Sequence, residues 1–289
     1  MIMAIPELDF KRIDTLVDLA LSEDLDERGD VTTESVIPAE LKVKAVLLAK
    51  EWLVCAGMPV AERVFKKLCP DLEFKALVKE GAECIPGTIM AEISGPARPI
   101  LEGERTALNF LQRLCGVATM SHRYQALAGD KLHVLDTRKT TPGWRNLEKY
   151  AVATGGAYNH RIGLFDRVML KDNHRELAGL EGAGGILRSV ERARAKYPDL
   201  EVEVEIDSLE ELNEALESKA EYILLDNMSC SDMAKAVRIT DGRAKLEASG
   251  NVTIGRIEEI AATGVDFVSS GALTHSVKSC DISLDIVPA

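Results

Sequence analysis

The chain has 289 residues, of which 46% are hydrophobic and 28% are charged, and its formal net charge is −12. These values are typical of a globular protein long enough for one large domain or two smaller ones. The negative charge argues against nucleic acid or an acidic membrane surface as the main partner, and no apolar run approaches the ~20 residues that a membrane helix requires. Residues 1–10 lack a basic segment before an apolar stretch, so we expect no signal peptide and a cytoplasmic location.

The first 110 residues mix helical and strand patterns. Apolar residues at helical spacing predict a helix over 7–25, and alternating apolar residues predict a half-buried strand over 41–50. A second helix is predicted over 58–68, followed by short strands near 72–78 and 87–93. This part of the chain is therefore expected to form an α+β domain.

The rest of the chain repeats a strand–helix pattern. After a long helix predicted from about 101 to 128, short apolar runs each end in a polar cluster, and most lead into a helical segment. The runs cover residues 133–136, 167–170, 201–206, 222–225, 245–248 and 266–269. This alternation predicts parallel strands, and repeated right-handed crossovers predict closure toward a barrel. Active sites of such barrels lie at the carboxyl ends of the strands, where the polar clusters fall.

The segment from Arg138 to Lys171 is locally basic, with seven Lys or Arg and two Asp or Glu. Such an island in an acidic protein indicates either a site for a small polyanion or a solvated basic face. Its side chains Arg138, Lys139, His160, Arg161 and Lys171 suit substrate carboxylates or phosphates, because guanidinium groups present planar forks. The alternative for each is a surface ion pair.

Acidic and small residues also follow the predicted strands. Glu205 and Asp226 suit a divalent metal or a developing ribosyl cation, although Asp226 alternatively caps the next helix. The turns 249–251 and 269–272 suit phosphate binding, with His275 as a further donor. The sequence has no G-x-G-x-x-G, P-loop or G-x-S-x-G motif.

The chain resembles the quinolinate phosphoribosyltransferase family on long motifs in family order. The strongest is Leu135-Asp-Thr-Arg-Lys-Thr-Thr-Pro-Gly143. Further matching segments are 28–33, 103–109, 148–152, 160–164, 171–174, 201–205, 223–227, 246–250 and 271–275. One departure is Asn251, where many relatives have a second glycine. A left-handed turn is somewhat less easy there, although Asn tolerates it better than most residues.

The resemblance implies a fold, domains and an assembly. It implies an N-terminal α/β sandwich domain over 1–115 and a C-terminal open, incomplete α/β barrel with parallel strands over 116–275. Residues 276–289 are expected to pack back on the N-terminal domain. The resemblance also implies a homodimer whose active sites are shared across the interface, with Arg105 supplied by the neighbouring subunit.

The resemblance further implies the roles of individual residues. Those implied for quinolinate are Arg105, Arg138, His160, Arg161 and Lys171. Those implied for the phosphoribosyl group are Lys139, Glu205, Asp226, Ser249, Gly250, Asn251, Gly271 and His275. Lys139, Lys171, Glu205 and Asp226 are the implied catalytic residues. Mg²⁺ is implied at Glu205 and Asp226, largely through water and substrate phosphates.

The implied activity transfers the phosphoribosyl group of phosphoribosyl pyrophosphate to quinolinate with decarboxylation, giving nicotinate mononucleotide in NAD biosynthesis. One alternative is a phosphoribosyltransferase that uses nicotinate, which has a single carboxylate and needs fewer cations. A second is a Schiff-base aldolase with Lys139 or Lys171 as nucleophile. A third is a binding protein that keeps the barrel without catalysis, as a related family linked to molybdenum uptake suggests.

Overall fold

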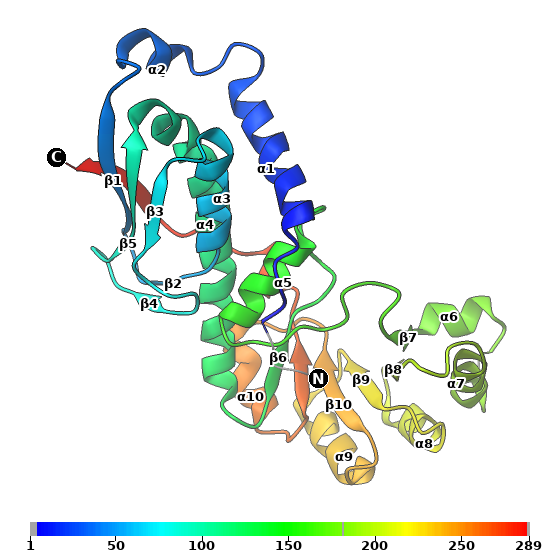
Figure 1. Cartoon of the computed structure of the whole chain (residues 1–289). Coiled ribbons are helices and arrows are strands. Elements are labelled where there is room, and N and C mark those ends of the chain that lie inside the picture. The colour runs from blue at the N-terminus through cyan, green and yellow to red at the C-terminus, as the bar shows by residue number, and fades with distance from the viewer. Residues whose placement is uncertain (1–4, 181, 288–289) are drawn as a thin grey trace. The chain divides into compact units, whose positions relative to one another are not determined.

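A computed structural model describes residues 5–180 and 182–287, which form two compact units (Figure 1). The first unit comprises the described residues of 1–122, 141–156 and 276–289, and the second comprises those of 123–140 and 157–275. The units interleave along the chain, unlike the continuous ranges 1–115, 116–275 and 276–289 expected from the sequence. Residues 1–4, 181 and 288–289 of those ranges lie outside the described residues.

The first unit contains a four-stranded antiparallel sheet in the order β12-β1-β5-β3. Its strands are β1 (Lys42–Ala49), β3 (Glu73–Ala76), β5 (Ile89–Pro96) and β12 (Ile282–Val287). Ala45, Leu47 and Ala49 are fully buried on one face of β1, as the alternating pattern predicts. The C-terminal strand β12 pairs with β1 from Ala49↔Ile282 to Lys44↔Val287. A short ribbon joins β2 (Leu53–Val54) to β4 (Glu83–Cys84).

Helices accompany this sheet in the first unit. They are α1 (Phe10–Leu25), α2 (Val31–Val36), α3 (Met58–Leu68), α5 (Arg145–Thr154) and the part of α4 (Ala97–Ala128) up to His122. Helix α1 begins after Asp9, whose side chain accepts a hydrogen bond from the Arg12 amide. Helix α3 has the predicted bounds. Helix α4 begins four residues before the predicted start. Pro99 lies in its first turn, where a proline is tolerated because backbone N–H groups there have no partner within the helix.

The second unit is an open, six-stranded parallel sheet with helices between its strands (Figure 1). The strand order is β6-β11-β10-β9-β8-β7, with β6 and β7 at the two edges. The strands are β6 (His133–Leu135), β7 (Val168–Leu170), β8 (Val202–Ile206), β9 (Tyr222–Asp226), β10 (Lys245–Ser249) and β11 (Phe267–Ser269). The helical segments are α6 (Asp172–Leu177), α7 (Gly185–Lys196), α8 (Leu209–Glu217), α9 (Cys230–Thr240), η1 (Ile254–Arg256), α10 (Ile257–Ala261) and α11 (Ala272–His275). The predicted fold class, with an open α/β barrel after an α/β sandwich domain, is confirmed.

Within residues 5–180 and 182–287, every helix is too short or too polar to cross a membrane.

Candidate active site

A cavity of about 460 Å³ lies at the carboxyl ends of the parallel strands of the second unit. Its lining residues are Thr137, Arg138, Lys139, His160, Arg161, Met169, Lys171, Glu205, Leu224, Asp226, Asn227, Glu247, Ser249, Gly250, Asn251 and Ser269. Ten of the thirteen residues named from the sequence are among them. The carboxyl-terminal edge of the sheet therefore brings together residues that are more than 100 positions apart in the sequence.

The pairing of the strands determines which side chains form one wall of this cavity. Glu205 on β8 and Glu247 on β10 both pair with Leu224 on β9. One pleat further along, Asp226 pairs with Ser249. Paired residues of adjacent strands face the same side of a sheet, and side chains two positions apart do so as well. One sheet face thus presents these five side chains together.

Four cationic side chains line the cavity: Arg138, Lys139, Arg161 and Lys171. Burial and the nearby charge of Arg138 lower the pKa of Arg161, so the cations crowd one another before any substrate arrives. The ammonium group of Lys171 contacts the carboxylate of Glu205.

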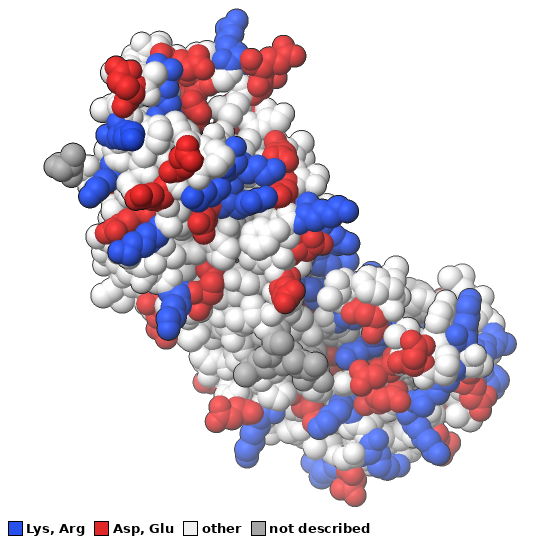
Figure 2. Space-filling model, in the orientation of Figure 1, with Lys and Arg blue, Asp and Glu red and all other residues white. Residues whose placement is uncertain are grey.

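The seven basic residues between Arg138 and Lys171 do not form one cluster in the fold. Arg145 and Lys149 belong to the first unit. Arg167 is buried and lies 3.4 Å from carboxylate oxygens of both Glu201 and Glu203. The remaining four cations are those of the cavity. Figure 2 shows basic and acidic side chains interspersed over the drawn face.

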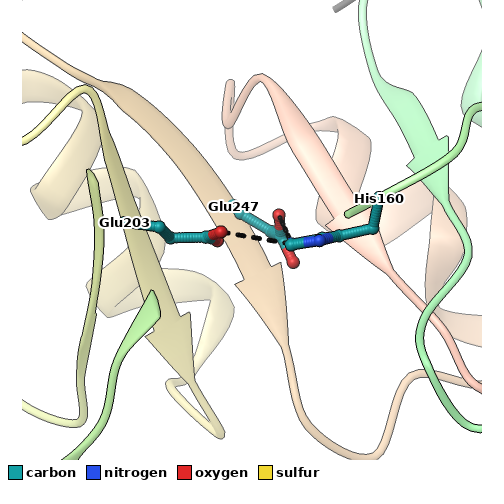
Figure 3. A group of neighbouring side chains, drawn as sticks. All are labelled: His160, Glu203 and Glu247. Atoms are coloured by element: carbon teal, nitrogen blue, oxygen red, sulfur yellow. Dashed lines mark ion pairs between the residues drawn. The ribbon is translucent and has the colours of Figure 1, made fainter. Parts of the chain in front are cut away.

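His160 is held from several sides at the cavity (Figure 3). Its backbone N–H donates to Asp136 Oδ1 at 2.8 Å, and its Nδ1 accepts from the Arg161 amide at 2.7 Å. Its Nε2 lies 3.2 Å from Glu203 Oε2 and 3.3 Å from Glu247 Oε2. Burial disfavours a charge on this ring, but Glu247 and Glu203 outweigh burial and raise the His160 pKa to about 10. The hydrogen bond from the Arg161 amide to Nδ1 favours the neutral ring instead, because Nδ1 accepts it only without a proton. Both forms keep a proton on Nε2, between the two carboxylates.

Glu203 and Glu247 come from alternate strands of the sheet, β8 and β10, and point toward His160 (Figure 3). Burial raises the pKa of Glu203, but His160 and Arg167 outweigh burial and hold it below its usual range. Burial and the neighbouring Glu203 raise the pKa of Glu247. The three side chains are close enough to share a metal ion, with donor atoms within 4.8 Å of one another. A hydrogen on Nε2 leaves no lone pair for a metal, so we interpret the group as an ionic cluster.

The acids predicted from the sequence end neighbouring strands. Glu205 contacts Lys171, and Asp226 accepts a hydrogen bond from Asn227 Nδ2 at 2.8 Å. The alternative role of Asp226 as a helix cap is wrong, because Ser229 caps α9 by accepting from the amide of Asp232.

The turn after β10 is left-handed at two consecutive residues, Gly250 with φ 89° and Asn251 with φ 49°. A Cβ atom at Gly250 would lie 2.2 Å from Asn227 Oδ1 and 2.8 Å from the Asn227 backbone nitrogen. Glycine is therefore required there for space as well as for φ. Asn251 adopts the left-handed conformation that was in doubt, and its side chain donates to Asn227 Oδ1 at 2.9 Å.

The three other predicted residues lie elsewhere. A Cβ at Gly271 would lie 2.8 Å from the His275 ring and 3.0 Å from Lys139 Cδ, so Gly271 and His275 adjoin a residue of the cavity. Arg105 belongs to the first unit, where it is exposed on α4.

Sequence reasoning missed several lining residues. They are Thr137, Met169, Leu224, Asn227 and Glu247. It also gave no role to Glu203. The alternation of acids and valines over 201–205 carries a signal for Glu203, because period-two spacing puts it on the same face as Glu205.

The comparisons with known proteins agree with one another. The family profile for the quinolinate phosphoribosyl transferase C-terminal domain matches residues 117–285, and that for the N-terminal domain matches residues 30–115. A rice protein named nicotinate-nucleotide pyrophosphorylase [carboxylating], chloroplastic, is 44% identical over 97% of this chain and 78% of its own length. A Synechocystis protein named probable nicotinate-nucleotide pyrophosphorylase [carboxylating] is 43% identical over 95% of this chain and 92% of its own. The crystal structure of NadC from Streptococcus pyogenes is similar with a TM-score of 0.91 and 40% identity, covering 98% of this chain and 100% of that one.

Profiles that together span most of the sequence, and relatives above 40% identity over nearly its whole length, point to one family. The chain belongs to the quinolinate phosphoribosyl transferase family.

Proposed function

We propose that this protein transfers the phosphoribosyl group of phosphoribosyl pyrophosphate to quinolinate, releasing pyrophosphate and carbon dioxide and forming nicotinate mononucleotide. The single observation that carries the proposal is the cavity itself. Four cations and two strand-end carboxylates line about 460 Å³ of one pocket. A dicarboxylate and a polyphosphate require several cations, and a ribosyl cation requires a carboxylate nearby.

The cations bind and orient the substrate in this proposal. Arg138 and Arg161 offer planar forks to the carboxylates of quinolinate, with His160 beside them. Lys171 adds a charge at the boundary between quinolinate and the ribosyl donor, and Lys139 reaches the donor. Burial, followed by the charge of Arg138, lowers the pKa of Arg161, and this supports the assignment because an entering dianion would stabilise the charged guanidinium against both effects.

The family implies a magnesium ion, and the residues present fit one. Glu205 and Asp226 supply oxygen donors from neighbouring strands on one wall of the cavity. Magnesium prefers one or two carboxylates together with waters and substrate phosphates. Because Glu205 already contacts Lys171, substrate phosphates and waters would complete the set. A bound magnesium ion would neutralise charge on the pyrophosphate as it leaves.

The turns after the last two strands are proposed to hold the 5-phosphate of the ribosyl donor. Ser249, Gly250 and Asn251 line the cavity, and Gly271 and His275 adjoin Lys139. Backbone N–H groups in a left-handed turn form a concave site for anions. The two consecutive positive φ angles at Gly250 and Asn251 support this role.

The protein's contribution to catalysis is positioning and electrostatics. Glu205 and Asp226 stabilise the positive charge that builds on the ribose as pyrophosphate departs and the pyridine nitrogen attacks. The ring nitrogen is then cationic and accepts the electrons released when the adjacent carboxylate leaves. The cations must hold that carboxylate weakly enough for it to leave as neutral carbon dioxide.

We further propose a homodimer in which Arg105 of one subunit completes the quinolinate site of the other. The exposure of Arg105 on α4 supports this, because an arginine that reaches a second chain must be accessible. We also propose the cytoplasm as the location, and the scattered positions of the six cysteines in a chain of this length support a reducing compartment.

The test is product formation from purified protein, phosphoribosyl pyrophosphate and magnesium, with quinolinate in one reaction and nicotinate in a second. Nicotinate mononucleotide from quinolinate alone supports the proposal. Product from nicotinate alone favours the single-carboxylate alternative. Covalent trapping by borohydride at Lys139 or Lys171 would favour the aldolase, and binding without any product would favour a binding protein.

A further inference from the structure

Glu247 differs from the other acids of the cavity. Three carboxyl side chains line the cavity. Two of them have partners, since Glu205 contacts Lys171 and Asp226 accepts a hydrogen bond from Asn227. Neither oxygen of Glu247 forms a hydrogen bond within the described part of the chain, and the residue is 1% exposed. Among the described residues, the ion-pair partner of Glu247 is Nε2 of His160, at 3.3 Å. A buried carboxyl group on the wall of a substrate cavity without a hydrogen-bond donor needs a reason.

The charge of the cluster indicates that Glu247 is a neutral acid. One Nε2 proton faces two buried carboxylates, and two carboxylates that share a site do not both ionise readily. Nδ1 of His160 accepts from the Arg161 amide and so carries no proton, which leaves the shared proton of the cluster on a carboxylate. Arg167 lies 3.4 Å from Glu203, so Glu203 keeps the negative charge and Glu247 keeps the proton. The directions of the two pKa shifts agree, lowered for Glu203 and raised for Glu247. A neutral Glu247 also does not repel a dianionic substrate.

The proposed reaction needs an acid at a defined step. When carbon dioxide leaves, the bond between the ring carbon and the carboxylate breaks, and its electron pair stays on that carbon beside the cationic nitrogen. The product carries a hydrogen there, so a proton must be delivered. Lys139, Lys171 and His160 also line the cavity and carry protons. Loss of a proton from either lysine would remove a charge that holds the substrate, and the Nε2 proton of His160 faces Glu203 and Glu247.

We propose that Glu247 is the acid that protonates the ring carbon after decarboxylation, an inference that rests on the proposed function. The O–H bond of Glu247 breaks as the C–H bond of the product forms. The resulting carboxylate lies beside Nε2 of His160 until it takes a proton from water. His160 and Glu203 are positioning residues in this step, since they act through Glu247.

The decisive variant is Glu247→Gln, which keeps the size and neutrality of the side chain but has no acidic proton. We expect kcat to fall by about 10²- to 10⁴-fold, as for loss of a general acid, with the quinolinate dissociation constant within about threefold of wild type. The wild-type kcat should decline as the pH rises through the raised pKa of Glu247, and this decline should be absent in the Gln variant. Glu203→Gln should move the decline to lower pH, because the charge that raises the Glu247 pKa is gone.

A second variant covers the case in which Gln disturbs folding. Glu247→Asp keeps an acid and should be at least about tenfold faster than Glu247→Gln. The inference is overturned if Glu247→Gln keeps kcat within threefold, if it retains the wild-type decline at high pH, or if Asp is no faster than Gln. These outcomes leave the proposed function intact, whereas a wild-type protein that forms no nicotinate mononucleotide overturns both.

Discussion

Replacing Gly250 by alanine tests the turn proposed to hold the 5-phosphate. The new Cβ would lie 2.2 Å from Asn227 Oδ1 and 2.8 Å from the Asn227 backbone nitrogen. The side-chain oxygen can rotate away only by giving up its hydrogen bond from Asn251. The backbone nitrogen cannot rotate, so the loops after β9 and β10 must move apart.

Two terms contribute to the expected effect of this substitution. A non-glycine residue at φ 89° costs about 1–2 kcal/mol. Displacing the turn by a few tenths of an ångström or more also moves its N–H groups away from the 5-phosphate. Loss of two charge-assisted hydrogen bonds to that phosphate corresponds to about 3 kcal/mol, or roughly 100-fold in affinity. We expect KM for phosphoribosyl pyrophosphate to rise by about 10- to 100-fold, while the quinolinate dissociation constant stays near wild type.

Gly242→Ala is the matched control. Gly242 also has a positive φ, of 73°, but its added Cβ would meet nothing within 4 Å. Both variants should therefore lose similar stability from backbone strain, seen as a lowered Tm, and only Gly250→Ala should change KM. Steady-state kinetics and thermal unfolding measure the two effects. A Gly250→Ala enzyme with KM within twofold of the Gly242→Ala enzyme would refute the reasoning.

Four further predictions follow from the contacts. Arg138→Ala should lower kcat/KM for quinolinate by at least about 100-fold, because a charged hydrogen-bond donor to the substrate is lost; near-normal kinetics would contradict its role. Glu148→Ala should lower Tm by roughly 5–15 °C, because it removes the buried partner of an ion pair in which Arg113 Nη2 lies 2.8 Å from Glu148 Oε1. The hydrogen bond from Arg63 holds the pKa of Asp14 below its usual value. The ion pair therefore stabilises the folded protein fully above the pKa that Asp14 has in the unfolded chain. This stabilisation is lost as the pH falls through the pKa of Asp14 in the folded protein. The Tm difference between wild type and Asp14→Asn should therefore be larger at pH 7 than at pH 3. Chelation of divalent metal should abolish turnover and added magnesium should restore it, whereas full activity in excess chelator would remove magnesium from the account.

The parallel sheet was predictable because each strand is a short apolar run that ends in polar residues. The alternation of Glu201–Glu205 and the run Tyr222–Leu225 became β8 and β9 at nearly the predicted bounds. The strong local periodicity leaves few alternatives for these segments.

Long-range contacts were harder to predict. The segment Thr141–Gly156 belongs to the first unit, where buried Glu148 accepts hydrogen bonds from Thr141 and pairs with Arg113. The sequence alone places its charges in one basic island with Arg138 and Lys171. Local sequence does not reveal such a pairing, because the partners lie 35 positions apart.

The buried acids of the site were also missed for a physical reason. Glu247 lies in the middle of β10, between residues typical of a strand interior. Acids are rarely buried unless they are paired, and the partner here, His160, comes from a loop 87 positions earlier. Only the folded sheet brings Glu203 and Glu247 to the same ring nitrogen of that histidine.

One cavity is proposed to couple ribosyl transfer to the loss of a particular carboxylate. Quinolinate labelled at the carboxyl group next to the ring nitrogen tests this coupling, with labelled carbon dioxide, pyrophosphate and nicotinate mononucleotide counted in the same reaction. We expect the three products in equal amounts, and no labelled carbon dioxide when only the other carboxyl group is labelled. Pyrophosphate and nucleotide without labelled carbon dioxide, or no product at all, would contradict it.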